Sequence, residues 1–164
     1  MTGAATRGGP WVLTASPAAT QAVAARLGAR LAPGDLVVLD GPLGAGKTVF
    51  VRGLAAGRGL APEVVRSPTF VLHHVYGSPP SLHHLDLYRL GPGAGIALLD
   101  LDTLLESAPA AVEWGSYADL AAWRPLRLTL DIEGDQARRI GAADPGTASP
   151  RLAAAWRVAA EAGG

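Results

Sequence analysis

The chain has 164 residues, the size of one ordinary domain that can bury a hydrophobic core without disulfide bonds or metal ions. Its 14 Lys and Arg residues balance 14 Asp and Glu residues, so no net positive charge holds nucleic acid or an anionic membrane, and we expect any RNA to be met through another protein. Cysteine is absent, which excludes disulfides and thiolate-bound zinc.

Neither a membrane span nor an export signal is predicted. The longest apolar runs, such as 36–39 and 108–112, are far shorter than the roughly 20 residues that cross a bilayer. The residues before Trp11 contain no apolar core of the roughly 7 to 15 residues typical of a signal peptide. We therefore expect a cytoplasmic protein with no membrane partner.

The first part of the chain predicts a tail, a helix and a buried strand. Residues 1–10 carry no periodicity and are typical of a flexible tail, and an extended segment follows over 11–14. A Ser-Pro pair then signals the start of a helix, which apolar side chains at helical spacing extend over 17–32. The continuous apolar run 36–39 is typical of a strand buried on both faces in a parallel sheet.

A phosphate-binding loop follows this strand. Residues 41–48 match the pattern G-x-x-x-x-G-K-[ST] between a predicted strand and a predicted helix. Its glycines let backbone N–H groups converge on a phosphate at the N-terminus of the helix. We expect Lys47, the only lysine of the chain, to reach the β- and γ-phosphates, and Thr48 to bind Mg²⁺. The predicted nucleotide contacts in this loop are Gly41, Leu43, Gly44, Ala45, Gly46, Lys47 and Thr48.

The middle of the chain predicts a helix and then a β-hairpin. Apolar residues repeat at helical spacing from Lys47 until glycines at 57–59 break the pattern. Segments 69–76 and 82–88 flank a Gly-Ser-Pro-Pro turn and predict two antiparallel strands. A short helix follows, with Ile96, Leu99, Leu104 and Leu105 on its apolar side.

The last part predicts three strands and two helices. A buried strand over 110–112 ends at Glu113, and a helix is expected over 117–123. Apolar and polar residues alternate over 126–132, which is typical of a half-buried strand, and 137–140 is expected to pair with it. A linker then leads to a terminal helix whose apolar face carries Leu152, Trp156 and Ala159.

Several kinds of P-loop protein are compatible with these features. A Ras-type GTPase needs N/T-K-x-D, which this chain cannot contain because its only lysine lies in the P-loop, and the D-x-x-G match at 131–134 is a weak signal. A small-metabolite kinase typically has an Arg-rich lid, whereas 91–112 contains no arginine. A nucleotide-gated binding module without turnover remains open beside an ATPase.

Four motifs, in this order, resemble the TsaE (YjeE) family. They are the loop with its strand at 39–48, Ser67-Pro68-Thr69-Phe70, His84-Leu85-Asp86-Leu87-Tyr88-Arg89-Leu90, and Val112-Glu113-Trp114. The resemblance covers about 14–140, and Pro42 stands where the family more often has Asp or Asn. It implies a small bacterial ATPase that works with TsaD-like and TsaB-like proteins to form threonylcarbamoyladenosine beside the anticodon, contacting tRNA only indirectly through that complex.

The resemblance also implies roles for residues outside the loop. Glu113 ends a strand at the position where P-loop proteins place an acid that binds Mg²⁺ or orients water, and Asp86 is the family's other functional acid. With Lys47 they form the predicted catalytic set, and Thr48, Glu113 and Asp86 form the predicted Mg²⁺ site. Thr69, Trp114 and Arg138 are further predicted nucleotide contacts, and ATP and Mg²⁺ are the expected cofactors.

The histidine doublets at 73–74 and 83–84 raise the question of a metal site. Neighbouring residues of a strand point to opposite faces of the sheet, so at most one histidine of each doublet joins a site with Asp86. Ordinary strand histidines are the favoured interpretation.

Together the elements predict an α/β fold of the P-loop NTPase type. We expect three layers, with parallel core strands flanked by antiparallel strands. The predicted organisation is a tail over 1–10, a P-loop ATPase domain over 11–142, and a linker with a C-terminal helix over 143–164.

Overall fold

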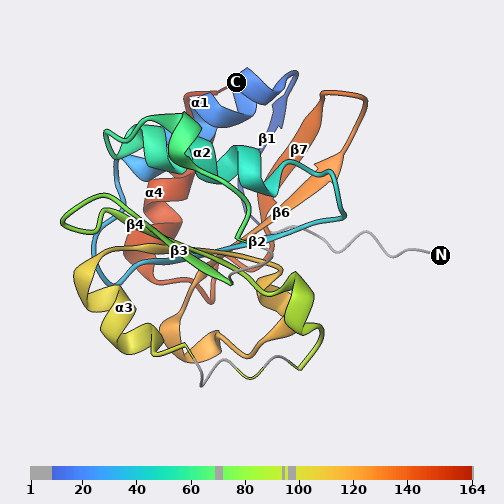
Figure 1. Cartoon of the computed structure of the whole chain (residues 1–164). Coiled ribbons are helices and arrows are strands. Elements are labelled where there is room, and N and C mark those ends of the chain that lie inside the picture. The colour runs from blue at the N-terminus through green and yellow to red at the C-terminus, as the bar shows by residue number, and fades with distance from the viewer. Residues whose placement is uncertain (1–8, 69–71, 94, 96–98, 164) are drawn as a thin grey trace.

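Seven strands form one mixed β-sheet across the middle of the molecule (Figure 1). The computed structural model describes residues 9–68, 72–93, 95 and 99–163. The strand order is β1-β7-β6-β2-β5-β4-β3. The strands are β1 (Trp11–Thr14), β2 (Leu36–Asp40), β3 (His73–Tyr76), β4 (Leu82–Asp86), β5 (Ala110–Glu113), β6 (Leu126–Ile132) and β7 (Arg138–Ala142).

The centre of the sheet is parallel and its margins are antiparallel. Strand β2 pairs in parallel with both β5 and β6, and β5 pairs in parallel with β4. Antiparallel pairs join β6 to β7, β7 to β1, and β4 to β3. The side chains of β2 from Leu36 to Leu39 are fully buried, as expected for a strand covered on both faces. The predicted arrangement of parallel core strands with antiparallel flanks is confirmed.

Helices cover both faces and complete three layers. Helices α1 (Pro17–Gly28), α2 (Lys47–Gly57) and α4 (Pro150–Glu161) lie on one side of the sheet, and α3 (Leu101–Ser107) lies on the other (Figure 1). Each side encloses its own cluster of buried apolar side chains. We call these sides the α2 face and the α3 face.

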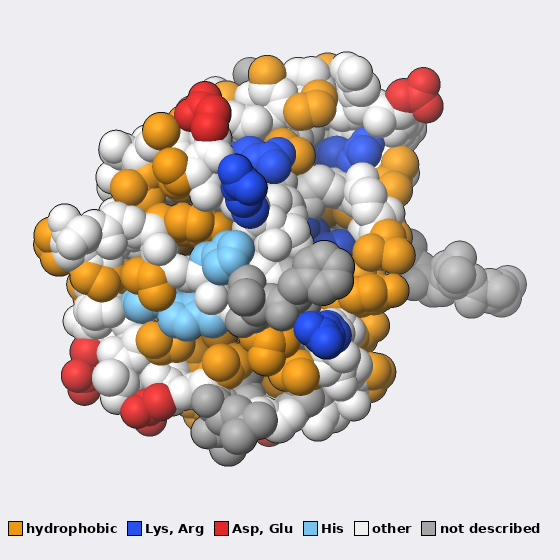
Figure 2. Space-filling view, viewed as in Figure 1, with side chains coloured by type: hydrophobic (Ala, Val, Ile, Leu, Met, Phe, Trp, Pro, Cys, Tyr) orange, Lys and Arg blue, Asp and Glu red, His pale blue; other side chains and the backbone are white. Residues whose placement is uncertain are grey.

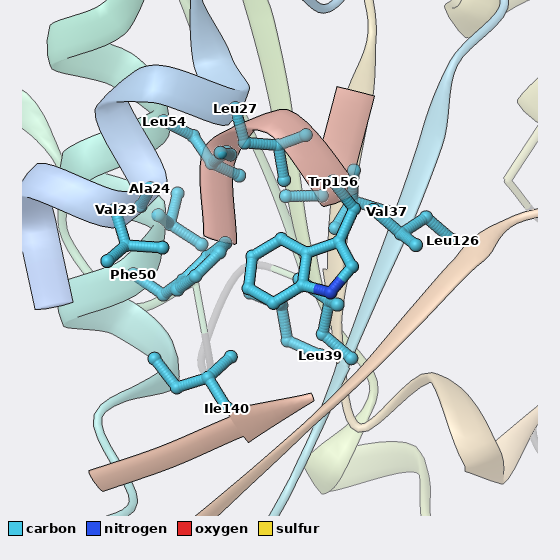
Figure 3. Close-up of a cluster of buried hydrophobic side chains, with 14 of the residues drawn as sticks. Val23, Ala24, Leu27, Val37, Leu39, Phe50, Leu54, Leu126, Ile140 and Trp156 are labelled. Carbon is cyan, nitrogen blue, oxygen red and sulfur yellow. The ribbon is translucent and has the colours of Figure 1, made fainter. Parts of the chain in front are cut away.

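The core of the α2 face is centred on Trp156 of α4 (Figure 3). Its indole ring lies 6.5 Å from the ring of Phe50, measured between centroids, and its Nε1 donates a hydrogen bond to the carbonyl oxygen of Pro10 at 2.8 Å. Because Phe50 belongs to the helix that begins at the phosphate loop, the C-terminal helix supports that loop from behind.

Helices α1 and α2 approach each other closely through glycines. A Cβ atom at Gly53 would collide with the carbonyl oxygen of Gln21, and one at Gly57 would collide with that of Ala25. Only glycine permits this spacing. The contact holds α2 against the rest of the α2 face, with the N-terminus of α2 at the carboxyl end of the central strand β2.

Two predicted helices differ from the structure. The helix expected over 17–32 ends at Gly28, because Arg30 and Leu31 form tighter turns with the carbonyls of Leu27 and Gly28. The helix expected over 117–123 is wrong. That region contains two 3-10 turns, Gly115–Tyr117 and Ala121–Trp123. The Asp119 carboxylate accepts a hydrogen bond from the backbone N–H of Ala121, a local contact that competes with a continuous helix.

Smaller differences concern strand and helix ends. The hairpin strands run over His73–Tyr76 and Leu82–Asp86, and Tyr88–Leu90 forms a 3-10 turn. A further 3-10 turn, Pro62–Val64, follows α2. Within the described part of the chain, every helix is too short or too polar to cross a membrane.

Candidate nucleotide-binding site

The phosphate loop connects the central strand β2 to helix α2, as its motif requires. Gly46 caps the helix in the left-handed conformation, with φ of 93°, a conformation that favours glycine. Gly41 passes so close to β6 that a Cβ atom would collide with the carbonyl oxygen of Leu130. The loop therefore depends on glycine both for its curvature and for its contact with the sheet.

Lys47 is folded back onto the loop. Its side chain is 5% exposed, and its ammonium donates hydrogen bonds to the carbonyl oxygens of Gly41 at 2.7 Å and Pro42 at 2.9 Å. The same nitrogen lies 4.2 Å from the centre of the Trp114 ring, within cation–π distance. Burial lowers the pKa of Lys47, and the nearby Glu113, Asp86 and Asp40 carboxylates oppose that shift.

Two buried carboxylates lie beside this lysine. Parallel pairing of β4 with β5 sets Asp86 opposite Glu113, and they are 2% and 3% exposed. The Thr48 hydroxyl donates to Oε1 of Glu113 at 2.8 Å. Asp86 accepts hydrogen bonds from the Ser67 hydroxyl at 3.3 Å and from the backbone N–H of Tyr88 at 2.9 Å. The parallel strands β4 and β5 thus place both carboxylates near the N-terminus of α2.

These residues enclose a pocket of about 400 Å³. We call it the loop pocket. It is lined by Leu43, Gly44, Gly46, Lys47, Thr48, Val49, Ser67, Asp86, Tyr88, Glu113 and Trp114. Eight of the residues predicted from sequence are among them, namely Leu43, Gly44, Gly46, Lys47, Thr48, Asp86, Glu113 and Trp114.

Trp114 takes an unusual backbone conformation in this site. Its φ of 59° is left-handed, which is rare for a bulky residue and is typical of functional sites. The indole contacts the rings of Tyr88 and Tyr117 in tilted arrangements, with ring centroids 4.9 Å and 5.4 Å away. Of these rings, those of Trp114 and Tyr88 line the loop pocket beside Lys47.

Three other predicted nucleotide contacts do not line the loop pocket. Gly41 and Ala45 belong to the loop but do not line that pocket. Arg138 donates to the carbonyl oxygens of Gly44 and Ala45, each at 3.0 Å. It also lines a second pocket of about 110 Å³ that shares Gly44, Gly46 and Val49 with the loop pocket and contains Thr20. Thr69 lies outside the described residues.

Residues that the sequence interpretation did not assign to the site extend it inward. Nε2 of His84 donates to Oε1 of Glu113 at 2.9 Å, and Nδ1 of His84 lies 3.0 Å from the Tyr76 hydroxyl. The alternation of β4 places His84 on the same side as Asp86, a signal present in the sequence. Finding Tyr76 requires the hairpin register, in which it pairs with Leu82.

The histidines separate as the strand alternation predicts. Figure 2 shows histidine side chains together over β3 and β4. Nδ1 of His83 lies 3.0 Å from Nε2 of His73, and Nε2 of His83 lies 2.8 Å from the Ser107 hydroxyl on the α3 face. Among the described residues, no group of three or more His, Cys, Asp or Glu side chains is arranged to hold a metal ion.

The donor set at the loop pocket fits Mg²⁺ in a different way. Thr48, Glu113 and Asp86 supply hard oxygen atoms, and Mg²⁺ in nucleotide sites is bound by one or two such groups together with phosphates and water. A protein cage of many ligands is not needed for this chemistry.

The fold and the loop define a protein of the P-loop NTPase type. A family model described as threonylcarbamoyl adenosine biosynthesis protein TsaE matches residues 14–140. The chain belongs to the TsaE family, whose role is in the biosynthesis of threonylcarbamoyladenosine in tRNA.

Individual relatives agree with this family. The tRNA threonylcarbamoyladenosine biosynthesis protein TsaE of Streptomyces coelicolor is 48% identical over 122 residues, which cover 70% of this chain and 81% of the relative. The protein of the same description from Mycobacterium leprae is 42% identical, with 68% and 76% covered. A crystal structure of YdiB from Bacillus subtilis aligns with a TM-score of 0.68 and 28% identity over 94% of this chain and 95% of YdiB.

Proposed function

We propose that this protein binds Mg-ATP in the loop pocket and hydrolyses it in support of the enzyme that modifies the adenosine beside the tRNA anticodon. The observation that carries the proposal is the convergence of a P-loop lysine, its neighbouring threonine and two buried carboxylates on one pocket. In this family context, such a convergence supports phosphoryl chemistry more than a structural role.

Lys47 and the loop amides would bind the phosphates. The ammonium already lies against the loop, where it donates to the carbonyls of Gly41 and Pro42. Phosphate oxygens are stronger acceptors than carbonyls, so Lys47 would exchange these partners for the β- and γ-phosphates. Release of the ammonium from the Trp114 ring would accompany binding.

Thr48, Glu113 and Asp86 would hold Mg²⁺. The hydrogen bond from the Thr48 hydroxyl to the Glu113 carboxylate, which brings these two oxygen donors together, supports this assignment. When bound, Mg²⁺ neutralises charge that develops on the phosphate oxygens.

Glu113 is the residue best placed to orient the attacking water. It is buried at the end of a core strand and faces the loop pocket. Little covalent chemistry is asked of the protein in phosphoryl transfer, because positioning and charge neutralisation supply most of the rate. Asp86 would assist by fixing the metal and, through the Ser67 hydroxyl, the segment beside it.

Arg138 would support nucleotide binding indirectly and at the edge of the site. Its guanidinium holds the carbonyls of Gly44 and Ala45, so the loop N–H groups remain turned toward the phosphate position. The second pocket, beside Thr20 and Arg138, shares Gly44, Gly46 and Val49 with the loop pocket and would take the rest of the nucleotide.

The partners follow from the family role. TsaD-like and TsaB-like proteins would form the complex in the cytoplasm, and the chemistry on tRNA would belong to the TsaD-like enzyme. Balanced charge over the chain supports contact with tRNA only through that complex. Here ATP hydrolysis would drive or reset a conformational cycle.

The direct test is ATP hydrolysis by the purified protein, first alone and then with TsaD-like and TsaB-like proteins. We expect turnover to rise on addition of these partners and to fall to background in Lys47→Ala. ATP consumption that is the same with and without the partners, together with phosphorylation of a small metabolite, would instead indicate a kinase. ATP binding with no turnover in any mixture would indicate a nucleotide-gated binding module.

A further inference from the structure

Two buried histidines stand next to each other on β4 and face different surroundings. His83 is 2% exposed and His84 is 0% exposed. The first turns to Ser107 and His73 on the α3 face, and the second turns to Glu113 and Tyr76 on the α2 face. Because the two histidines are similarly buried but contact different groups, the role of His84 has to be inferred from its partners, Glu113 and Tyr76.

A chain of hydrogen bonds runs through His84 from the loop to the backbone of Arg66. Oε1 of Glu113 accepts from the Thr48 hydroxyl and from Nε2 of His84. Nδ1 of His84 lies 3.0 Å from the Tyr76 hydroxyl. The Tyr76 oxygen accepts a hydrogen bond from the N–H of Arg66 at 3.3 Å. The single hydroxyl proton of Tyr76 is donated either to Nδ1 of His84 or to the carbonyl oxygen of Arg66 at 3.1 Å, and the path through His84 uses the first.

The chain returns to the site through the next residue. Ser67 follows Arg66 and donates its hydroxyl to Asp86 at 3.3 Å. The segment 66–67 is thus tied to one acid directly and to the other through Tyr76 and His84. Both carboxylates of the loop pocket share this segment as a common support.

Glu113 needs such support because its carboxylate is almost fully buried. A buried carboxylate is oriented by protein donors and not by bulk water. If Thr48 turns its hydroxyl to a metal ion, His84 remains as a donor to Oε1, and the imidazole is itself kept in place by Tyr76. Orientation of the acid then depends on residues that touch neither nucleotide nor metal.

We propose that His84 and Tyr76 are positioning residues that fix Glu113 for ATP hydrolysis and couple it to the segment 66–67. This inference rests on the proposed ATPase function. It predicts that loss of either side chain slows turnover while ATP still binds, because the phosphate contacts are unchanged.

The first experiment separates turnover from binding. ATP hydrolysis is measured in the mixture that supports wild-type turnover, and Mg-ATP affinity is measured by calorimetry, for Tyr76→Phe, His84→Ala and His84→Gln. The matched control is His83→Gln, on the same strand and equally buried. We expect Tyr76→Phe and His84→Ala to lower kcat by roughly 10- to 100-fold, since small misplacements of a catalytic group have effects of that size, with the Kd for ATP within about threefold.

The conservative variant and a double-mutant cycle define the pathway. Gln at position 84 keeps an N–H donor for Glu113, so we expect it to recover part of the activity lost in His84→Ala. In a Glu113→Gln background, Tyr76→Phe should cause little further loss, because both changes act through the same carboxylate. If the fold loss in kcat of the double variant equalled the product of the losses in the two single variants, the residues would act independently and the proposal would be overturned.

A readout without nucleotide completes the test. Hydrogen exchange at the Arg66 and Ser67 amides of the free protein should become several-fold faster in His84→Ala, which does not touch these residues, and should stay unchanged in His83→Gln. The positioning role would be refuted if Tyr76→Phe hydrolysed ATP with the same kcat as the wild type. It would also be refuted if hydrogen exchange at Arg66 and Ser67 were unchanged in His84→Ala. Absence of ATP binding in the wild type would refute the proposed function itself, which is a distinguishable outcome.

Discussion

The two faces of the sheet bury apolar side chains in the same way but differ in their polar content. On the α2 face, the buried side chains of Lys47, His84, Asp86 and Glu113 gather at the end of the parallel strands. On the α3 face, buried polar contacts centre on His83 with Ser107. Buried charges are costly unless they are paired, so their concentration on one face marks that face as the functional one.

Trp114 lies where the two faces meet. It is left-handed and lines the loop pocket, and it also packs against the apolar cluster of the α3 face that contains Leu105 and Leu120. Changes to the buried polar side chains of the α2 face should therefore alter nucleotide chemistry, and matched changes on the α3 face should leave that chemistry intact.

The largest expected effect is on catalysis. Glu113→Gln keeps the shape of the side chain but removes its charge, and we expect kcat for ATP hydrolysis to fall by about 100- to 10,000-fold, the range typical of a lost acid or base. Mg-ATP affinity should stay within about tenfold. Glu106→Gln, on α3, is the control, and equal activity in both variants would contradict the assignment.

The next effect concerns the packing behind the loop. Trp156→Ala removes the centre of the larger core, and we expect the free energy of unfolding to fall by about 3–5 kcal/mol, measured by denaturant titration. Trp123→Ala, a partly buried tryptophan beside the α3 cluster, should cost clearly less. A smaller loss at Trp156 than at Trp123 would show that α4 does not support the α2 face.

A smaller effect is expected at the loop carbonyls. Arg138→Ala removes the hydrogen bonds to Gly44 and Ala45, and we expect Mg-ATP affinity to weaken by roughly tenfold, equivalent to about 1.4 kcal/mol. Arg139→Ala is the matched control, because this neighbour lies over the Trp11 ring. Calorimetry that gives one affinity for both variants would remove Arg138 from the binding site.

The smallest effect is a pH dependence of stability at the histidine pair. Burial lowers the pKa of both His73 and His83 below the ordinary value of 6.5. Well above pH 6.5 they are neutral in both states and contribute nothing. Below it the unfolded chain takes up protons that the native protein resists, so the free energy of unfolding falls as the pH is lowered from about 6.5.

The variants His73→Gln and His83→Gln isolate this effect. Denaturant titrations between about pH 7 and 5.5 avoid most carboxylate titration, and each variant should show a shallower loss of stability than the wild type. Identical slopes would mean that these two histidines do not resist protonation.

Much of this architecture could be predicted from local patterns. The run 36–39, the loop at 41–48 and the alternation over 126–132 identify strands and the phosphate site, because period and glycine content are local properties. The helix expected over 117–123 is replaced by two 3-10 turns, and local contacts such as that of Asp119 with the N–H of Ala121 compete with a helical pattern. Element ends depend on such details.

The site could be predicted in part for a related reason. Lys47, Thr48, Asp86 and Glu113 are recognisable from motifs, and the structure brings them together. His84 belongs to the same motif as Asp86 and lies on the same side of β4, which the sequence already indicates. Its contact with Glu113, and the place of Tyr76, depend on which strands pair and in which register, and this information is not local.

The most direct test of the central claim is a calorimetric titration of a non-hydrolysable Mg-ATP analogue into the wild-type protein and into Lys47→Ala. The ammonium of Lys47 donates hydrogen bonds to two neutral carbonyls and lies over an aromatic ring, and phosphate oxygens, which are stronger acceptors, should displace these partners readily. We predict one binding site in the wild type and an affinity at least about 100-fold weaker in the variant. Equal affinity in the two proteins would contradict nucleotide binding at this loop.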